Sequence, residues 1–320
     1  MDEVNGDAPK RATKVRRRVI EADGFRTNSN FSGERFGCSG KMQAVAEAPL
    51  EASRYRSFRM AVRTVFRRLY TRRMIQVFHP IPVESLKLLV FDLDGTLIDS
   101  AQDLCNSVNA ALDHVSLHAL PDSLIASFVG NGAPLLVRRA LASSTGGDPE
   151  GVADDLQART YGFFLDYYRE HKLDFTYAYG GVLEALAALN ALHDLQGGIR
   201  RTMAVLTNKP VRPAQGICDG LGLADFFLHI YGGDSFSTKK PNPEGLISLM
   251  NEVGARPEET VMVGDSKVDV QVARNAGVWS VGCAFGFGPQ NLMETPPDVL
   301  VDSASEWSEV LVPGKSASQV

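Results

Sequence analysis

The sequence has few cysteines and no long apolar run. Its four cysteines, Cys38, Cys105, Cys218 and Cys283, form no CxxC pair and have no nearby histidine partner, which argues against a zinc site. Scattered thiols of this kind are typical of buried cysteines in a reducing cytoplasm. No apolar run approaches the length of a membrane-spanning helix, and the N-terminus lacks the apolar core of a secretory signal. We therefore predict a cytoplasmic protein without a transmembrane segment.

An excess of positive charge is also missing from the chain as a whole. Residues 1–83 contain 17 Lys and Arg against 8 Asp and Glu, a balance of +9, whereas the remainder contains 16 against 30, a balance of −14. The net charge of −5 gives no reason to expect nucleic-acid binding. A chain of 320 residues, 44% hydrophobic and 22% charged, is long enough to bury a sizeable core and has an ordinary globular composition.

The N-terminal part differs from the rest. Residues 1 to about 50 are rich in Gly, Ser, Asn and charge, which predicts disorder. Residues 54–78 contain eight arginines among apolar side chains at helical spacing. They form either an amphipathic helix for an anionic membrane or a partner, or a tail without function that is translated because the start codon is placed too early. The later starts would be Met42, Met60 and Met74. We assign residues 1–83 to a basic, largely disordered extension.

From residue 86 onward, short apolar runs alternate with helical stretches. The expected strands cover residues 86–92, 202–207, 228–231, 259–264 and 278–283. The expected helices between the later strands cover residues 181–193, 211–221, 243–253 and 267–276. This alternation predicts an α/β fold: a doubly wound, Rossmann-like parallel sheet with helices on both faces.

One interval breaks the alternation. After the first strand, some eighty residues show helix signals only, at 101–115, 132–143 and 150–170. We predict that residues 101–179 form a helical cap domain, inserted into a core made of residues 84–100 and 180–320. A cap at this point in the chain would pack over the carboxyl edge of the sheet, where open α/β sheets bind their ligands.

The stretch VFDLDGTLIDS, residues 90–100, places two carboxylates at the end of the first strand. Asp92 and Asp94 stand two residues apart, so on a straight strand they would point the same way. Gly95 allows the chain to turn, which lets both carboxylates converge on one point. Converging carboxylates repel each other unless a cation or a shared proton compensates, and a hard divalent ion is the usual solution. The stretch therefore predicts a site for a hard divalent ion such as Mg²⁺.

Four separated motifs between about Leu86 and about Leu311 resemble those of the haloacid dehalogenase-like phosphohydrolases. The DxDxT motif is matched by Asp92, Asp94 and Thr96, and the Ser or Thr that ends a strand is matched by Thr207 in AVLTNK. The lysine of the third motif is matched by Lys240 in KKPNPE. The acidic pair is matched by Asp265 and Asp269 in VMVGDSKVDV. The four occur in the family's order, each at a predicted strand end or in the loop that follows.

The resemblance implies a mechanism with an aspartyl-phosphate intermediate. Asp92 would attack phosphorus, and Asp94 would protonate the leaving oxygen and then deprotonate the attacking water. The implied Mg²⁺ ligands are Asp92, the backbone carbonyl of Asp94, and Asp265, and the metal would let an anionic phosphate approach an anionic nucleophile.

The remaining motif residues would bind or support the phosphate. Thr207 and the amides that follow it, beginning with Asn208, would donate hydrogen bonds to phosphate oxygens, and Lys240 would supply a compact positive charge. Asp269 would orient Lys240 or a metal-bound water.

The cap segment SFVGNGAPLLVRRAL, residues 127–141, resembles that of phosphoglycolate phosphatases. Gly130, Asn131 and Gly132 would form a turn whose amides face the active site at the start of a helix, an arrangement that suits an anion. Arg138 and Arg139 would either serve a substrate carboxylate or face water. The resemblance thus implies a Mg²⁺-dependent phosphatase that converts 2-phosphoglycolate, a small phosphorylated metabolite, to glycolate and phosphate.

Three alternatives stay open at this point. A phosphosugar mutase shares the same motifs but returns the phosphoryl group to a sugar. A phosphatase for another small ester, a nucleoside monophosphate or pyrophosphate would also fit them. A non-catalytic phosphate-binding regulator would use the arginine-rich segment as its partner-binding arm.

Overall fold

The computed structural model describes residues 75–191 and 201–314, and a seven-stranded sheet lies at its centre. The strand order is β1-β9-β8-β7-β2-β5-β6, and all neighbours are parallel except the edge pair β1 and β9. The strands are β1 (Gln76–Val77), β2 (Leu88–Phe91), β5 (Thr202–Leu206), β6 (Ile230–Tyr231), β7 (Thr260–Gly264), β8 (Trp279–Cys283) and β9 (Val299–Val301). All five predicted strands are present, whereas the sequence analysis missed β1 and β9.

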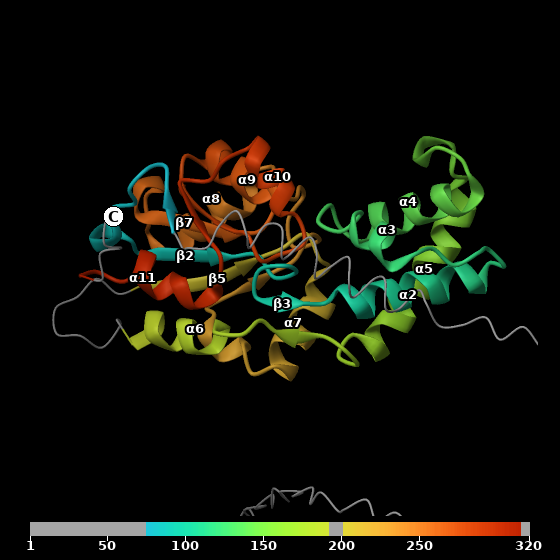
Figure 1. The fold of residues 1–320 in the computed structure, drawn as a ribbon, viewed down its shortest axis with the longest axis horizontal. Helices are drawn as coiled ribbons and strands as arrows, with labels where there is room; N and C mark the ends of the chain where they lie inside the picture. The colour runs from blue at the N-terminus through green and yellow to red at the C-terminus, as the bar shows by residue number, and fades with distance from the viewer. Residues whose placement is uncertain (1–74, 192–200, 315–320) are drawn as a thin grey trace, which may run out of the picture. The chain divides into compact units, whose positions relative to one another are not determined.

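Helices cover both faces of this sheet, as Figure 1 shows. They are α6 (Val182–Ala191), α7 (Val211–Gly220), α8 (Glu244–Val253), α9 (Lys267–Ala276), α10 (Pro289–Glu294) and α11 (Trp307–Leu311). The end of the helix predicted over 181–193 lies outside the described residues. The core is therefore the doubly wound α/β fold that the strand-helix alternation predicted.

Alternation along β2 explains the two layers. Leu88 and Val90 point to one face, where they are buried against α8 and α9. Leu89 and Phe91 point to the other face, where the core contains residues of α6, α7 and α11, including Trp307. Successive side chains of a strand point to opposite faces, so a central strand that is apolar at every position is buried on both sides.

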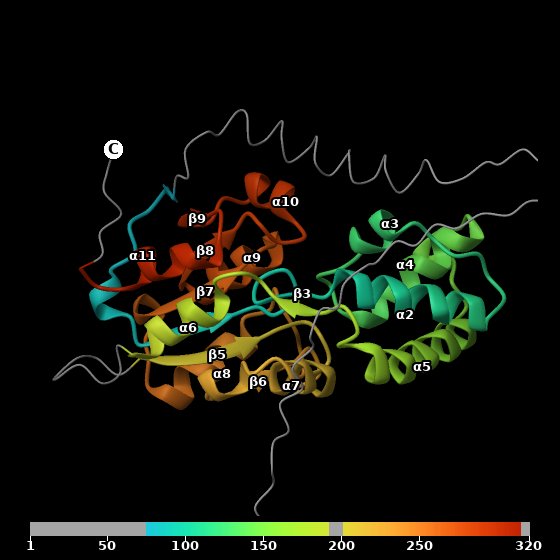
Figure 2. The ribbon, with the colours of Figure 1, turned by 60° about the horizontal axis from the view of Figure 1, so that its bottom comes forward.

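A helical group interrupts the core between β3 (Ile98–Asp99) and β4 (Tyr177–Ala178), which pair antiparallel. Its helices are α2 (Ala101–His114), α3 (Asp122–Ala126), α4 (Ala133–Thr145) and α5 (Asp154–His171), which Figures 1 and 2 show gathered together. The sequence analysis predicted α2, α4 and α5 but missed α3. Helix α5 begins at residue 154 rather than 150 because Pro149–Gly151 form a short 3₁₀ turn first.

The segment assigned to the extension contributes to the sheet at its end. The helix predicted over 54–78 lies outside the described residues except at its last positions, where Gln76–Val77 form β1 instead of continuing a helix. Three cysteines, Cys105, Cys218 and Cys283, are buried free thiols as predicted, and Cys38 lies outside the described residues. None of the helices within residues 75–191 and 201–314 is both long and apolar enough to cross a lipid bilayer.

Candidate active site

The candidate site lies where three neighbouring parallel strands end. Strand β2 lies between β7 and β5, so the carboxyl ends of the three strands meet at one edge of the sheet. The residues that follow these ends line one cavity of about 300 Å³. They are Asp92 and Asp94 after β2, Thr207 and Asn208 after β5, and Asp265 after β7.

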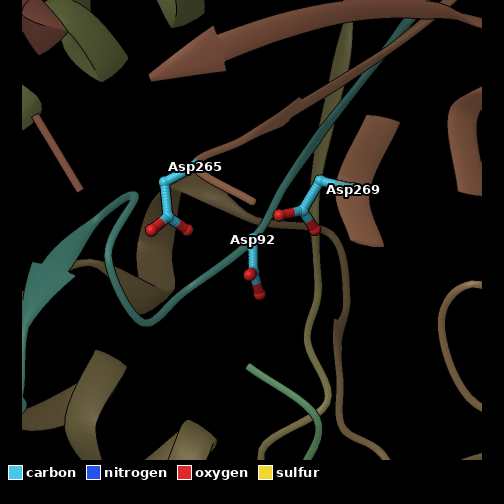
Figure 3. Close-up of side chains that lie close together, drawn as sticks. All are labelled: Asp92, Asp265 and Asp269. Carbon is cyan, nitrogen blue, oxygen red and sulfur yellow. The ribbon is translucent and has the colours of Figure 1, made fainter. Parts of the chain in front are cut away.

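Three carboxylates gather at this edge, as Figure 3 shows. One carboxylate oxygen from each of Asp92, Asp265 and Asp269 lies within 4.8 Å of the others. All three residues are buried. Asp269 lies in the first turn of α9, where it accepts hydrogen bonds from the amide and hydroxyl of Ser266 at 3.1 and 2.6 Å and so caps the helix. Its role at the helix start also fixes its place beside the other two carboxylates.

Lys240 is the cation that contacts this group. Its ammonium lies 2.6 Å from Oδ1 of Asp269 and 3.0 Å from Oδ1 of Asp92, and its side chain is buried. The structure therefore brings Lys240 and Asp269 together. The adjacent Lys239 points elsewhere and donates to the carbonyl of Asn131 at 2.7 Å.

The electrostatics of the group fit a divalent cation. Burial raises the pKa of Asp92 to about 6, against the opposing effect of Lys240, and Asp269 raises it further. Burial, Asp269 and Asp92 raise the pKa of Asp265 well above its ordinary value. Three buried carboxylates facing one ammonium leave an excess of negative charge, and an all-oxygen donor set is the kind that Mg²⁺ prefers.

Asp94 has its own cation, which the sequence analysis missed. The Lys209 ammonium donates to both carboxylate oxygens of Asp94 at 2.9 and 3.1 Å, and Ser100 Oγ donates to Oδ1 at 2.5 Å. Burial alone would lower the pKa of Lys209, but Asp94 and Tyr168 together outweigh burial and the pKa is raised. The only signal in the sequence was position: Lys209 directly follows Asn208, and Ser100 closes the stretch that carries both aspartates.

Thr207 and Asn208 occupy different places in the site. Thr207 is buried, and its Oγ1 accepts a hydrogen bond from the Lys209 amide at 3.2 Å, which leaves the hydroxyl hydrogen for a ligand. The Asn208 side chain donates to the carbonyls of Gly130 and Lys240 at 3.1 and 3.0 Å. Asn208 therefore ties the glycine turn to the Lys240 loop, and its backbone amide stays a candidate for binding phosphate.

Comparison with known proteins decides the family. Residues 89–283, more than half of the chain, match the family model described as haloacid dehalogenase-like hydrolase. The chain belongs to the haloacid dehalogenase-like hydrolases.

Individual relatives narrow the position of this hydrolase within the family. The phosphoglycolate phosphatase of Vibrio vulnificus (strain YJ016) is 38% identical over 232 residues, which cover 72% of this chain and 97% of the relative. That of Chromobacterium violaceum is 36% identical over 232 residues, with 72% and 99% covered. The crystal structure of a predicted phosphoglycolate phosphatase from Haemophilus somnus 129pt has a TM-score of 0.64 and 31% identity, and the match covers 69% of this chain and 96% of that one. This hydrolase is therefore a phosphatase similar to phosphoglycolate phosphatases.

The glycine turn of the hydrolase faces the cavity, but its arginines do not. Gly130 and Gly132 line the cavity at the start of α4. Arg139 donates to the Asn131 side chain at 3.1 Å and to the Phe128 carbonyl at 3.3 Å, so it stabilises the turn. Arg138 is paired with Asp154 at 2.9 Å. Neither Arg138 nor Arg139 lines the cavity, so the structure gives no support to the idea that they bind a substrate carboxylate.

A tight cradle holds the Asp265 carboxylate of the hydrolase. Oδ2 accepts from the amides of Phe287 and Gly288 at 2.7 and 3.3 Å, and Oδ1 accepts from Thr96 Oγ1 at 3.4 Å. Gly95, with φ +85°, lies so close that a Cβ there would meet Oδ2 at 2.3 Å. This close approach and the positive φ both require glycine at that position.

We expect Gly95→Ala to lower both stability and activity. The positive φ costs about 1–3 kcal/mol for alanine, and the clash forces Asp265 out of its cradle in addition. Gly146→Ala is the matched control, because Gly146 has φ +70° but no neighbour within 4 Å of the added Cβ. Thermal unfolding and phosphatase rates of the two variants would test this. Equal losses in both variants would show that the cradle does not restrict residue 95.

Proposed function

We propose that this phosphatase hydrolyses 2-phosphoglycolate to glycolate and phosphate through a phosphorylated Asp92, with Mg²⁺. One observation carries the chemistry: Asp92 and Asp94, each paired with its own buried lysine, line the same cavity. The choice of substrate is supported by the phosphoglycolate phosphatases, to which the chain is similar over nearly their whole length.

In the first step Asp92 attacks phosphorus. The Lys240 ammonium and the Leu93 amide both contact Oδ1 of Asp92, at 3.0 and 2.7 Å, so Oδ2 is the oxygen that we assign as nucleophile. The new bond joins Oδ2 to phosphorus while the bond from phosphorus to the ester oxygen breaks. Asp94 gives its proton to that oxygen, and glycolate leaves.

In the second step water releases the phosphate. Asp94, now an anion, takes a proton from the water as the water oxygen bonds to phosphorus, and the bond from phosphorus to Asp92 breaks. Lys209 and Ser100 hold the Asp94 carboxylate during both proton transfers. Thr207 and the Asn208 amide donate to the phosphate oxygens as their charge shifts.

Asp92, Asp265 and the backbone carbonyl of Asp94 would hold Mg²⁺, with Asp269 beside them. When bound, the metal supplies positive charge that offsets the carboxylates and polarises the phosphate. A cytoplasmic location is part of the proposal and is supported by the buried free thiols.

A panel of phosphate esters tests the proposal. We expect 2-phosphoglycolate to have the highest kcat/KM among small esters, nucleoside monophosphates, pyrophosphate and hexose phosphates, and we expect a chelator to abolish phosphate release and added Mg²⁺ to restore it. If another ester has a higher kcat/KM, the proposed substrate is wrong but the proposed mechanism is unaffected. Conversion of one hexose phosphate into another without release of phosphate would favour a mutase, and full activity in chelator would contradict the metal.

A further inference from the structure

Among the residues that the structure describes, a single positively charged side chain lines the cavity. Among the described residues that line it, three are acidic, namely Asp92, Asp94 and Asp265, and Lys209 is the only lysine or arginine. Lys240 lies behind Asp92, where it is paired with Asp92 and Asp269. A substrate that brings a carboxylate in addition to its phosphate therefore meets one cation on the cavity wall.

Lys209 is built into the wall rather than placed on the surface. Its side chain is 4% exposed, and its ammonium lies 4.6 Å from the centre of the Tyr168 ring, which reaches the cavity from α5. A cation over an aromatic face is stabilised without a hydrogen bond. The Tyr168 hydroxyl is buried as well and makes no hydrogen bond of normal geometry within the described residues. Lys209, from the core, and Tyr168, from the inserted helices, thus present two donors to the cavity.

The position of Lys209 relative to the leaving group follows from Asp94. A general acid lies within hydrogen-bond reach of the oxygen that it protonates, and the Lys209 ammonium lies 2.9 Å from Oδ1 of Asp94. The ammonium is therefore within about 6 Å of the ester oxygen. In 2-phosphoglycolate only one methylene and the carboxyl carbon separate this oxygen from the carboxylate oxygens. A carboxylate attached directly to the ester carbon is placed to reach Lys209.

We propose that Lys209, with the Tyr168 hydroxyl beside it, binds the carboxylate of the substrate and so determines specificity for phosphate esters that carry a carboxylate next to the ester carbon. This inference rests on the proposed function. It assigns to Lys209 the role that the sequence analysis left open for Arg138 and Arg139, which bind Asp154 and the glycine turn instead.

The test compares two esters of similar size, 2-phosphoglycolate and ethyl phosphate, in the wild type and in Lys209→Met. Because loss of the ammonium disturbs Asp94 with either ester, the informative quantity is the ratio of the two kcat/KM values. We expect this ratio to fall by about 10- to 100-fold, the effect of one hydrogen bond to a charged group, mainly through KM for 2-phosphoglycolate. Lys172→Met, a lysine at the end of α5 that does not line the cavity, removes the same charge and should keep the ratio.

Each outcome has one reading. If Lys209→Met keeps the wild-type ratio while both rates fall, Lys209 only positions Asp94 and the inference is wrong. If the wild type itself shows no preference for 2-phosphoglycolate, the proposed substrate fails first, and the wild type alone reveals it. If Lys209→Met turns over neither ester, calorimetry can measure the Kd of each ester instead. The preference for 2-phosphoglycolate in binding should then fall relative to the wild type, and an unchanged preference would overturn the inference. If it does not fold, Lys209→Arg keeps the charge and should retain more discrimination than Lys209→Gln, and equal discrimination in these two would also overturn the inference.

Discussion

Replacing Asp92 by asparagine should abolish turnover while the protein stays folded. The variant loses its nucleophile, and we expect kcat to fall by about 10⁴-fold or more, as for other nucleophile deletions. The melting temperature should not fall. Burial raises the pKa of Asp92 to about 6, above the ordinary value of 3.8, so at neutral pH its charge costs free energy in the folded protein relative to the unfolded chain. The uncharged asparagine removes this unfavourable charge.

Phosphate release in Mg²⁺ measures the loss of turnover, and thermal unfolding in chelator measures the effect on stability. Asp113→Asn, on the exposed end of α2, is the control for the chemical change itself. Asp92→Asn with kcat within about tenfold of the wild type would rule out the covalent mechanism. A large drop in melting temperature would instead mean that the pair with Lys240 outweighs the cost of burying the charge.

Lys240→Met should damage both stability and catalysis. Removing one partner from a buried ion pair leaves Asp92 and Asp269 uncompensated, which costs about 3–5 kcal/mol of unfolding free energy. We also expect kcat to fall by about 10²- to 10³-fold, because the charge beside the reacting oxygens is lost. Denaturant unfolding in chelator and steady-state rates in Mg²⁺ provide the measurements.

The neighbouring lysine gives the matched control. Lys239 is more exposed and contacts a cap carbonyl rather than a carboxylate, so Lys239→Met should cost far less in both measurements. Mg²⁺ should also stabilise Lys240→Met more than the wild type, because the cation replaces part of the missing charge. Equal effects of the two substitutions would contradict a role for Lys240 in the site.

The family motifs, together with the apolar runs that precede them, indicated the residues that the sheet brings together. Asp92, Thr207 and Asp265 each follow an apolar run, and parallel order places the ends of such runs at one edge, so no contact had to be known in advance. Lys240 and Asp269 came from their place in the motifs. Only the structure shows that Lys240 contacts the carboxylates while Lys239 contacts the Asn131 carbonyl, because the direction of each side chain depends on how the loop folds.

What escaped the sequence analysis was set by tertiary contacts. Lys209, in the loop after β5, and Ser100, directly after β3, become site residues because the fold brings them to Asp94, and apart from their nearness to the motifs no local pattern encodes this. Helix α3 has five residues and strands β1, β3 and β4 have two each, too few for a periodic signal. The arginines of α4 look like anion ligands in the sequence, but the packing of the helix directs them to other partners.

The pairing of β1 with β9 protects one edge of the sheet from pairing with another molecule. β9 is a wholly buried apolar strand, Val299–Val301, whose outer side would be an open edge without β1, and such an edge is a template for pairing with another molecule. Two residues close it, and the amides of Phe78 and His79 continue the contact by donating to the Asp298 carbonyl at 2.8 and 3.0 Å. At the opposite edge β6 has only two residues, too short to recruit a partner strand. A shortened protein that begins at residue 84 would keep every catalytic group but would expose β9 and be prone to aggregation. One that begins at residue 75 would keep the same groups and leave β9 covered by β1.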